Sequence, residues 1–244
     1  MPKSPSARIF VALIVVSGLF LLVEAVLNAH AIAAGRFIAF AILAVVAARL
    51  KVKLPGLSGI MSVNLPFILL AAALLGTAEA AMIGFVSTFA QSLPSGKQKF
   101  NPVQLVFNCC AITLAVSAAR MIYMSAEVTS LVAAAPLRLA VAASGFYLVN
   151  TVTVAMVISL SEKLNLVRTW AEMFQLSFTY LVASAGLAGL ALTVGQESGW
   201  QVPLAMLPVM IGVFYSYRRY FATASAAIRG EQMDTARVAA RVHA

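Results

Sequence analysis

The residues best suited to chemistry in this chain are side-chain amides that lie within long apolar runs: Asn64, Gln104, Asn108, Asn150 and Gln175. Each amide carries both hydrogen-bond donors and acceptors, so it can join neighbouring helices or line a polar pocket. Two interpretations stay open, namely contacts that hold helices together and a binding site for a small neutral ligand. We expect Asn64, Asn108 and Asn150 to surround one polar cavity.

Two charged residues also lie at the edges of apolar runs. Glu24 lies near the end of the first predicted span, and Arg36 lies near the start of the second. Charged groups in or near lipid need partners. We expect an ion pair between Glu24 and Arg36 across the turn, with a contact to a ligand as the alternative.

The sequence contains no recognisable catalytic or metal-binding motif. No Ser/His/Asp set, glycine-rich phosphate loop or metal-ligand spacing is present. The adjacent Cys109 and Cys110 are poorly placed for a disulfide, and His30 and His243 lie at opposite ends of the chain. The sequence therefore predicts a non-enzymatic protein without a metal or another cofactor.

The elements that must position these amides are membrane helices. Of the 244 residues, 62% are hydrophobic and 10% are charged, whereas soluble domains average roughly 45–50% apolar and about 25% charged residues. The predicted fold is an all-α, polytopic membrane helix bundle with six long helices and two short or re-entrant helices. The long helices are expected at Ile9–Leu27, Ile32–Leu50, Pro102–Met124, Leu137–Leu160, Glu172–Val194 and Trp200–Tyr217, and the short ones at Ser62–Gly76 and Ala78–Leu93.

The two short runs follow an irregular stretch. Residues Leu54–Gly59 contain Pro55, Gly56 and Gly59, and Pro66 follows inside the first short run. These residues interrupt helical hydrogen bonding. The runs form either a tight pair of short spans or a re-entrant hairpin inside the bundle. Irregular backbone at membrane depth needs protein or a wet cavity around it, so both alternatives make this stretch part of the candidate site.

The basic residues predict the orientation. With the N-terminus inside, all of the 17 lysines and arginines except Arg36, Arg120 and Arg138 fall on the cytoplasmic side. Both termini are then cytoplasmic, and we expect a bacterial inner-membrane protein. The net charge of +9 belongs to cytoplasmic loops, so nucleic-acid binding is not expected. A signal-peptide cleavage near Ala29-His30-Ala31 is an alternative that would remove the first span.

Several stretches resemble a known family of membrane regions. They are Leu50–Gly56 with Ser62–Gly76, Pro102–Asn108, Phe146–Val152, Phe174–Gly189 and Gly199–Arg218. Together they resemble the N-terminal membrane region found ahead of diguanylate cyclase and HD-type phosphodiesterase domains in bacterial signalling proteins. In those proteins a linker helix and a catalytic domain follow, whereas here the sequence stops soon after Tyr220. The resemblance implies a sensory module that acts through a protein partner on the cytoplasmic side.

The order of the segments is also similar, more loosely, to the substrate-binding membrane subunits of energy-coupling-factor vitamin transporters. We expect a membrane domain over residues 1–220 and a basic cytoplasmic tail over residues 221–244. The expected function is a sensory or small-ligand-binding module. The alternatives are a substrate-binding transporter subunit and a structural subunit of a larger membrane complex.

Overall fold

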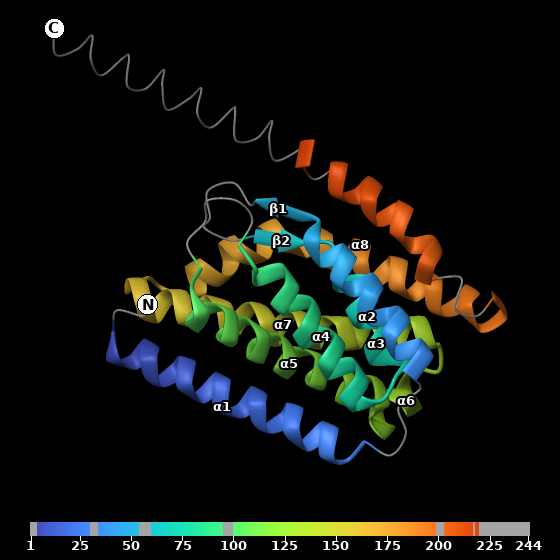
Figure 1. Ribbon diagram of the computed structural model, residues 1–244, viewed down its shortest axis with the longest axis horizontal. Coiled ribbons are helices and arrows are strands. Elements are labelled where there is room, and N and C mark those ends of the chain that lie inside the picture. The colour runs from blue at the N-terminus through green and yellow to red at the C-terminus, as the bar shows by residue number, and fades with distance from the viewer. Residues whose placement is uncertain are drawn as a thin grey trace, which may run out of the picture.

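The computed structural model describes residues 4–29, 34–53, 60–94, 100–198, 203–216 and 218–219. Its elements are α1 (Pro5–Leu27), α2 (Ala34–Arg49), β1 (Lys51–Lys53), β2 (Ile60–Ser62), α3 (Leu65–Leu74), α4 (Thr77–Ser92), α5 (Pro102–Met124), α6 (Ala126–Leu131), α7 (Ala135–Glu162) and α8 (Leu166–Ser198). A further apolar helix, Pro203–Ser216, follows α8. Figure 1 shows these helices packed side by side as one bundle.

Four of the helices have the length and composition needed to cross a membrane. They are α1, α5, α7 and the Ser177–Gly195 part of α8. This finding indicates a membrane protein and supports the all-α class. The prediction of six long helices is not confirmed, because α2 has only 16 described residues and Pro203–Ser216 is also short. The residues 54–59 and the tail 221–244, on which other expectations rested, lie outside the described residues.

Helix α3 occupies the centre of the bundle. It is only 10 residues long, and every residue from Leu65 to Ala72 is buried. Pro66 lies in its first turn, where a proline costs no helical hydrogen bond. A helix that is apolar on all sides must be surrounded by protein or lipid, and α3 contacts α2, α4, α5, α7 and α8. It therefore packs inside the bundle.

The free C-terminal carbonyls of α3 are bound by an arginine from α5. Nη1 of Arg120 donates hydrogen bonds to the carbonyl oxygens of Ala72 at 2.8 Å and Ala73 at 3.3 Å. A helix end leaves carbonyls without intrahelical partners, and a cation near them is favourable. Arg120 thus provides partners for the carbonyls at the C-terminal end of α3.

A short antiparallel hairpin precedes α3. Lys51, Val52 and Lys53 of β1 pair with Ser62, Met61 and Ile60 of β2. Nζ of Lys51 donates to the carbonyl oxygen of Leu93 at 2.7 Å, and Nη1 of Arg49 donates to that of Ala90 at 3.2 Å. Burial, together with the nearby charge of Arg49, lowers the pKa of Lys51 below its usual value. Lys51 thus joins the hairpin, and Arg49 joins the end of α2, to the C-terminal end of α4.

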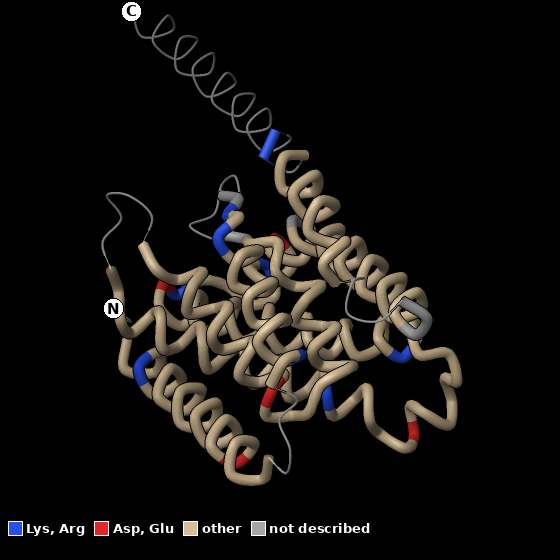
Figure 2. Tube along the Cα trace, turned by 45° about the vertical axis from the view of Figure 1, so that its right-hand side comes forward, with Lys and Arg blue, Asp and Glu red and all other residues tan. Residues whose placement is uncertain are grey.

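The two ends of the bundle differ in charge. We call the end that carries the hairpin the hairpin end; it also holds the N-termini of α1, α5 and α8 and the C-termini of α4 and α7. Among the described residues, the hairpin end has Arg8, Arg49, Lys51, Lys53, Lys163 and Arg168, whereas the opposite end has Arg36, Arg120 and Arg138. Figure 2 shows the charged residues mainly near the helix ends, with long uncharged stretches between them.

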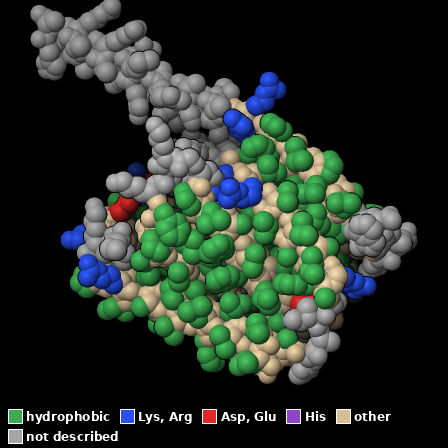
Figure 3. Space-filling model, in the orientation of Figure 1, with side chains coloured by type: hydrophobic (Ala, Val, Ile, Leu, Met, Phe, Trp, Pro, Cys, Tyr) green, Lys and Arg blue, Asp and Glu red, His purple; other side chains and the backbone are tan. Residues whose placement is uncertain are grey.

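The outer surface of the bundle is apolar. Figure 3 shows a face covered mainly by hydrophobic side chains, with basic groups mostly towards its margin. Helix α1 is mostly exposed and contacts chiefly α5. The two helices approach closely at Gly18, where an added Cβ atom would lie 2.6 Å from Cβ of Cys110. The exposed apolar side of α1 is suited to lipid.

Candidate functional site

A cavity of about 690 Å³ lies between the hairpin, α3, α5, α7 and α8. Four of the five amides singled out from the sequence line it, namely Asn64, Gln104, Asn108 and Asn150. Gln91 of α4 lines it as well. Its volume falls in the range of roughly 300–1,000 Å³ that is typical of small-molecule sites. The structure therefore brings together side chains from positions far apart in the sequence.

Asn64 is held rigidly at the entrance to α3. Its Oδ1 accepts a hydrogen bond of 2.7 Å from Oγ of Ser62, and its Nδ2 donates to Oγ of Ser87 on α4 at 3.3 Å. All three side chains are buried. Because both ends of this amide already have protein partners, Asn64 contributes mainly to positioning the start of α3.

Tyr180 of α8 holds the same segment from the other side. Its hydroxyl donates to the carbonyl oxygen of Ser62 at 2.8 Å and accepts from the backbone N–H of Leu65 at 3.3 Å. The irregular backbone between β2 and α3 therefore finds its partners in side chains of other helices. This arrangement meets the requirement that backbone groups inside a membrane bundle be satisfied by protein.

Asn108 and Asn150 differ from Asn64 in lacking protein partners. Asn108 lies on α5 and Asn150 on α7, and both side chains are half-buried. Within the described part of the chain neither amide makes a hydrogen bond to protein, yet both line the cavity. An amide that faces an interior space without a partner requires water or a ligand there, since leaving it unpaired costs about 1–3 kcal/mol.

The wall of the cavity on α7 and α8 is joined by hydroxyl and ring contacts. Oη of Tyr147 and Oγ of Ser177 are 2.8 Å apart. Nε1 of Trp170 donates to Oγ1 of Thr151 at 3.1 Å. The ring of Phe174 lies between those of Trp170 and Tyr147, with centroid distances of 5.4 Å and 5.8 Å. These contacts fix the α7 face that presents Asn150.

Gln175 lies away from this cavity. Its side chain is exposed, while Met173 and Ser177, two residues before and after it on α8, both line the cavity. Residues two apart on a helix point to nearly opposite sides. The structure thus does not bring Gln175 to the site with the other four amides.

The expected ion pair between Glu24 and Arg36 is not formed. Among the described residues the one salt bridge joins Arg168 and Glu172 at 3.1 Å. Both Glu24 and Arg36 are exposed, and Glu24 instead lines a second, smaller pocket. The residues 30–33, which connect α1 to α2, lie outside the described part.

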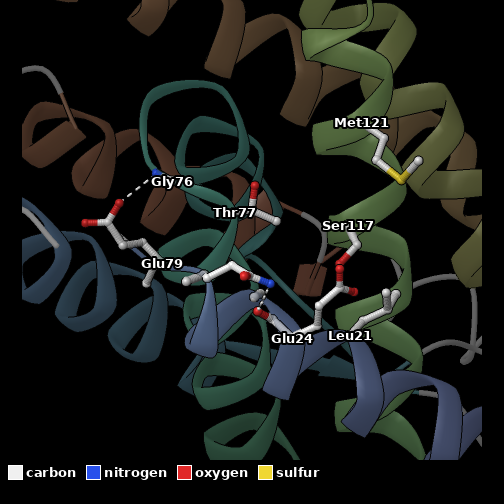
Figure 4. A pocket seen from close by; sticks show the side chains of 11 residues that line it. Leu21, Glu24, Gly76, Thr77, Glu79, Ser117 and Met121 are labelled. Carbon is white, nitrogen blue, oxygen red and sulfur yellow. Dashed lines mark hydrogen bonds between the residues drawn. The ribbon is translucent and has the colours of Figure 1, made fainter. Parts of the chain in front are cut away.

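This second pocket, at the opposite end of the bundle, has a volume of about 400 Å³ and is lined by Glu24, Gly76, Glu79 and Ser117 among others. Oε2 of Glu79 accepts a hydrogen bond of 2.6 Å from the backbone N–H of Gly76. Figure 4 shows Glu79 turned towards Gly76, whereas Glu24 extends towards Ser117. The two carboxylates do not converge on one point, and Glu79 binds back to the backbone of Gly76, the N-cap residue of α4.

The described residues contain no group of three or more His, Cys, Asp or Glu side chains that could hold a metal ion. Cys109 and Cys110 are buried and not bonded to each other. Both histidines of the sequence, His30 and His243, fall outside the described residues.

Several residues at the cavity were not singled out as candidates from the sequence. They are chiefly the tyrosines Tyr147 and Tyr180 and the serines Ser62 and Ser177. One signal could have found the tyrosines: each lies well inside an apolar run, where its hydroxyl needs a partner. The serines carried no such signal. Ser177 is helical and can donate to its own backbone, as it does to Met173, and Ser62 lies at the end of the short strand β2.

No family model matches this chain, no curated protein is similar to it, and no solved structure is similar to it. The fold and the site together define a class, that of a membrane helix bundle with a cavity that side-chain amides and hydroxyls help to line. What the cavity does has to be argued from its own geometry.

Proposed function

We propose that this protein is a non-enzymatic membrane module that binds a small uncharged ligand in the cavity and acts through a partner protein. The observation that carries the proposal is the pair of amides on Asn108 and Asn150. Both face the cavity, and neither has a partner among the described residues. Such groups are favourable at membrane depth only when something polar occupies the space between them.

The surroundings of the two amides support binding rather than simple helix contact. Asn64, Tyr180 and Ser87 form a fixed network beside the cavity, and the Tyr147–Ser177 contact fixes the opposite wall. A rigid wall with a few convergent polar groups is the usual construction of a small-molecule site. In a purely structural subunit, Asn108 and Asn150 would be bonded to neighbouring helices as Asn64 is.

The partner and the location are further parts of the proposal. The excess of basic residues at the hairpin end supports placing that end in the bacterial cytoplasm. The protein partner would then meet the hairpin and the loops beside it.

The proposal can be tested by measuring how a panel of metabolites changes the melting temperature of the full chain in lipid nanodiscs. Compounds that raise the melting temperature of the unaltered protein should fail to do so for Asn108→Leu and Asn150→Leu. The matched control is Gln175→Leu, which removes the same kind of group outside the cavity and should keep the response. A response lost equally in Gln175→Leu, or kept in both cavity variants, would contradict ligand binding at this site.

A further inference from the structure

The cavity lies entirely within one half of the bundle. On α5 its lining residues run from Val103 to Ile112, although the helix continues to Met124. On α7 they begin only at Phe146, and on α8 they end at Leu181. Each of these limits falls on the side nearer to the hairpin end, so the cavity extends from that end to about the middle of the bundle.

The core around α3 is tightly packed in the opposite half of the bundle. Ala115 and Ala119 of α5, Leu139 of α7 and Ala188 of α8 are all 0% exposed, and the three alanines let the helices approach closely. The second pocket lies apart from this core, between α1, α4 and α5, and shares no lining residue with the cavity. Arg120, which binds the last carbonyls of α3, seals the same region. A solute in the cavity therefore has no described route to the opposite end.

The rim of the cavity lies at the hairpin end. Asn101, Ser161, Glu162, Leu164 and Thr169 line it there, and they belong to the start of α5, the end of α7 and the first turns of α8. These residues adjoin the loops between helices, where water reaches the protein.

The charges of the lining restrict what can enter. Its described residues include no lysine, arginine or histidine, and its only carboxylates are Glu162 and Glu172. Both carboxylates are exposed, and Glu172 is paired with Arg168. Deeper in the cavity the polar groups are amides and hydroxyls without charge. The hairpin end around the rim is basic, but an anion that entered would find no counter-charge among the described lining of a poorly solvated space.

We infer that the cavity admits an uncharged polar solute from the hairpin end alone and rejects anions. This inference rests on the proposed function and adds the class of the ligand and its side of entry. It separates the protein from a subunit that captures substrate from outside the cell, because that task requires an opening at the opposite end.

Cysteine accessibility tests the inference with probes of known charge. Asn150→Cys is made in a Cys109→Ala/Cys110→Ala background of the full chain, and Asn108→Cys serves as a second variant if the first does not fold. Three methanethiosulfonates that do not cross bilayers are compared: a neutral sugar-linked reagent, the sulfonate and the trimethylammonium. Each rate is divided by the rate of the same reagent with 2-mercaptoethanol. Sealed vesicles of both orientations are used, and the side of the hairpin end is identified with Lys163→Cys.

We expect the sugar-linked reagent to modify the cavity cysteine only from the hairpin side, and about 10-fold or more faster than the sulfonate, because the sulfonate would have to give up its water without gaining a counter-charge. Glu162→Gln/Glu172→Gln should raise the sulfonate rate several-fold. Equal normalised rates for the neutral and anionic reagents, or modification from the opposite side, would overturn the inference while leaving a binding cavity in place. If the protein folds but none of the three reagents modifies the cysteine, the interior is closed or dry. That result would contradict the proposed function as well.

Discussion

At the scale of single residues, the three asparagines around the cavity divide into two kinds. Asn64 has both of its amide atoms bonded, to Ser62 and Ser87. Asn108 and Asn150 have no such partners among the described residues and face the open space. The first kind stabilises the fold, and the second kind is available to a ligand. Their effects on stability should therefore differ, although the chemical change is the same.

Asn64→Leu should lower the free energy of unfolding by about 1–3 kcal/mol, because it leaves the buried hydroxyl of Ser62 without its acceptor. Asn150→Leu should change it by no more than roughly 0.5 kcal/mol, since no protein hydrogen bond is lost and water or ligand is displaced. Equilibrium unfolding in mixed detergent micelles measures both. Equal losses in the two variants would show that Asn150 is bonded to protein after all.

The sequence predicted the positions of Asn64, Asn108 and Asn150 around one cavity because amides in apolar runs must face something polar. The prediction that Gln175 lines the cavity was wrong, and the helical periodicity of α8 would have placed its side chain on the other face. Thr169, Met173 and Ser177 follow one another at intervals of four residues and line the cavity, so a residue between Met173 and Ser177 lies on the other face. The Glu24–Arg36 prediction failed because proximity in sequence across a turn does not fix the direction of either side chain.

At the scale of elements, α3 is the unusual feature. Pro66 and the glycines before it indicated a break in the helical pattern, and the apolar run after Pro66 indicated burial. Neither showed that α3 would be surrounded by five other helices, because burial on all sides depends on tertiary packing rather than on local pattern. The role of Arg120 could not be predicted from the sequence either, because its position near the end of an apolar run does not indicate that it binds the carbonyls of α3.

Arg120→Met should destabilise the protein by about 2–3 kcal/mol, because two charge-assisted hydrogen bonds to the carbonyls of Ala72 and Ala73 are lost. Arg120→Lys, which keeps the cation but not the planar guanidinium, should recover part of this loss. Thermal unfolding of the purified variants in detergent provides the measurement. A methionine variant as stable as the parent would mean that water can reach the end of α3.

The contact between α1 and α5 gives a prediction with a matched control. Gly18→Val places a side chain where Cys110 leaves no room, since even a Cβ atom would lie 2.6 Å from Cβ of Cys110. The expected cost is about 1–3 kcal/mol, with α1 displaced from α5. Gly35→Val on α2 adds the same side chain where nothing lies within 4 Å. Unfolding experiments that find the two variants equally stable would contradict the close approach.

At the scale of the whole molecule, the larger cavity lies in one half of the bundle, and the core around α3 is densely packed in the other half. Composition was enough to predict a membrane helix bundle, because no soluble fold could bury so much apolar surface. Composition could not predict which half would hold the larger cavity. Its position depends on tertiary packing: Ala115 and Ala188 are fully buried where the helices are close together, and Asn108 and Asn150 line the cavity.

The orientation of the bundle makes a direct topological prediction. Single cysteines replacing Lys163, at the hairpin end, and Met124, at the opposite end, should be modified from opposite sides of the membrane. In intact cells an impermeant thiol reagent should reach only Met124→Cys, because the basic hairpin end is expected in the cytoplasm. Modification of Lys163→Cys from outside would reverse the orientation.

Ligand binding in the cavity can be tested by an experimental density map of the chain, purified from its native membrane without harsh detergent. We expect non-protein density in the cavity within hydrogen-bonding distance of the side-chain amides of both Asn108 and Asn150. We also expect that Asn64 stays bonded to Ser62 and Ser87, as in the present structure. A map in which Asn108 and Asn150 are bonded to neighbouring helices, with apolar side chains filling the space between them, would contradict ligand binding and favour a purely structural subunit.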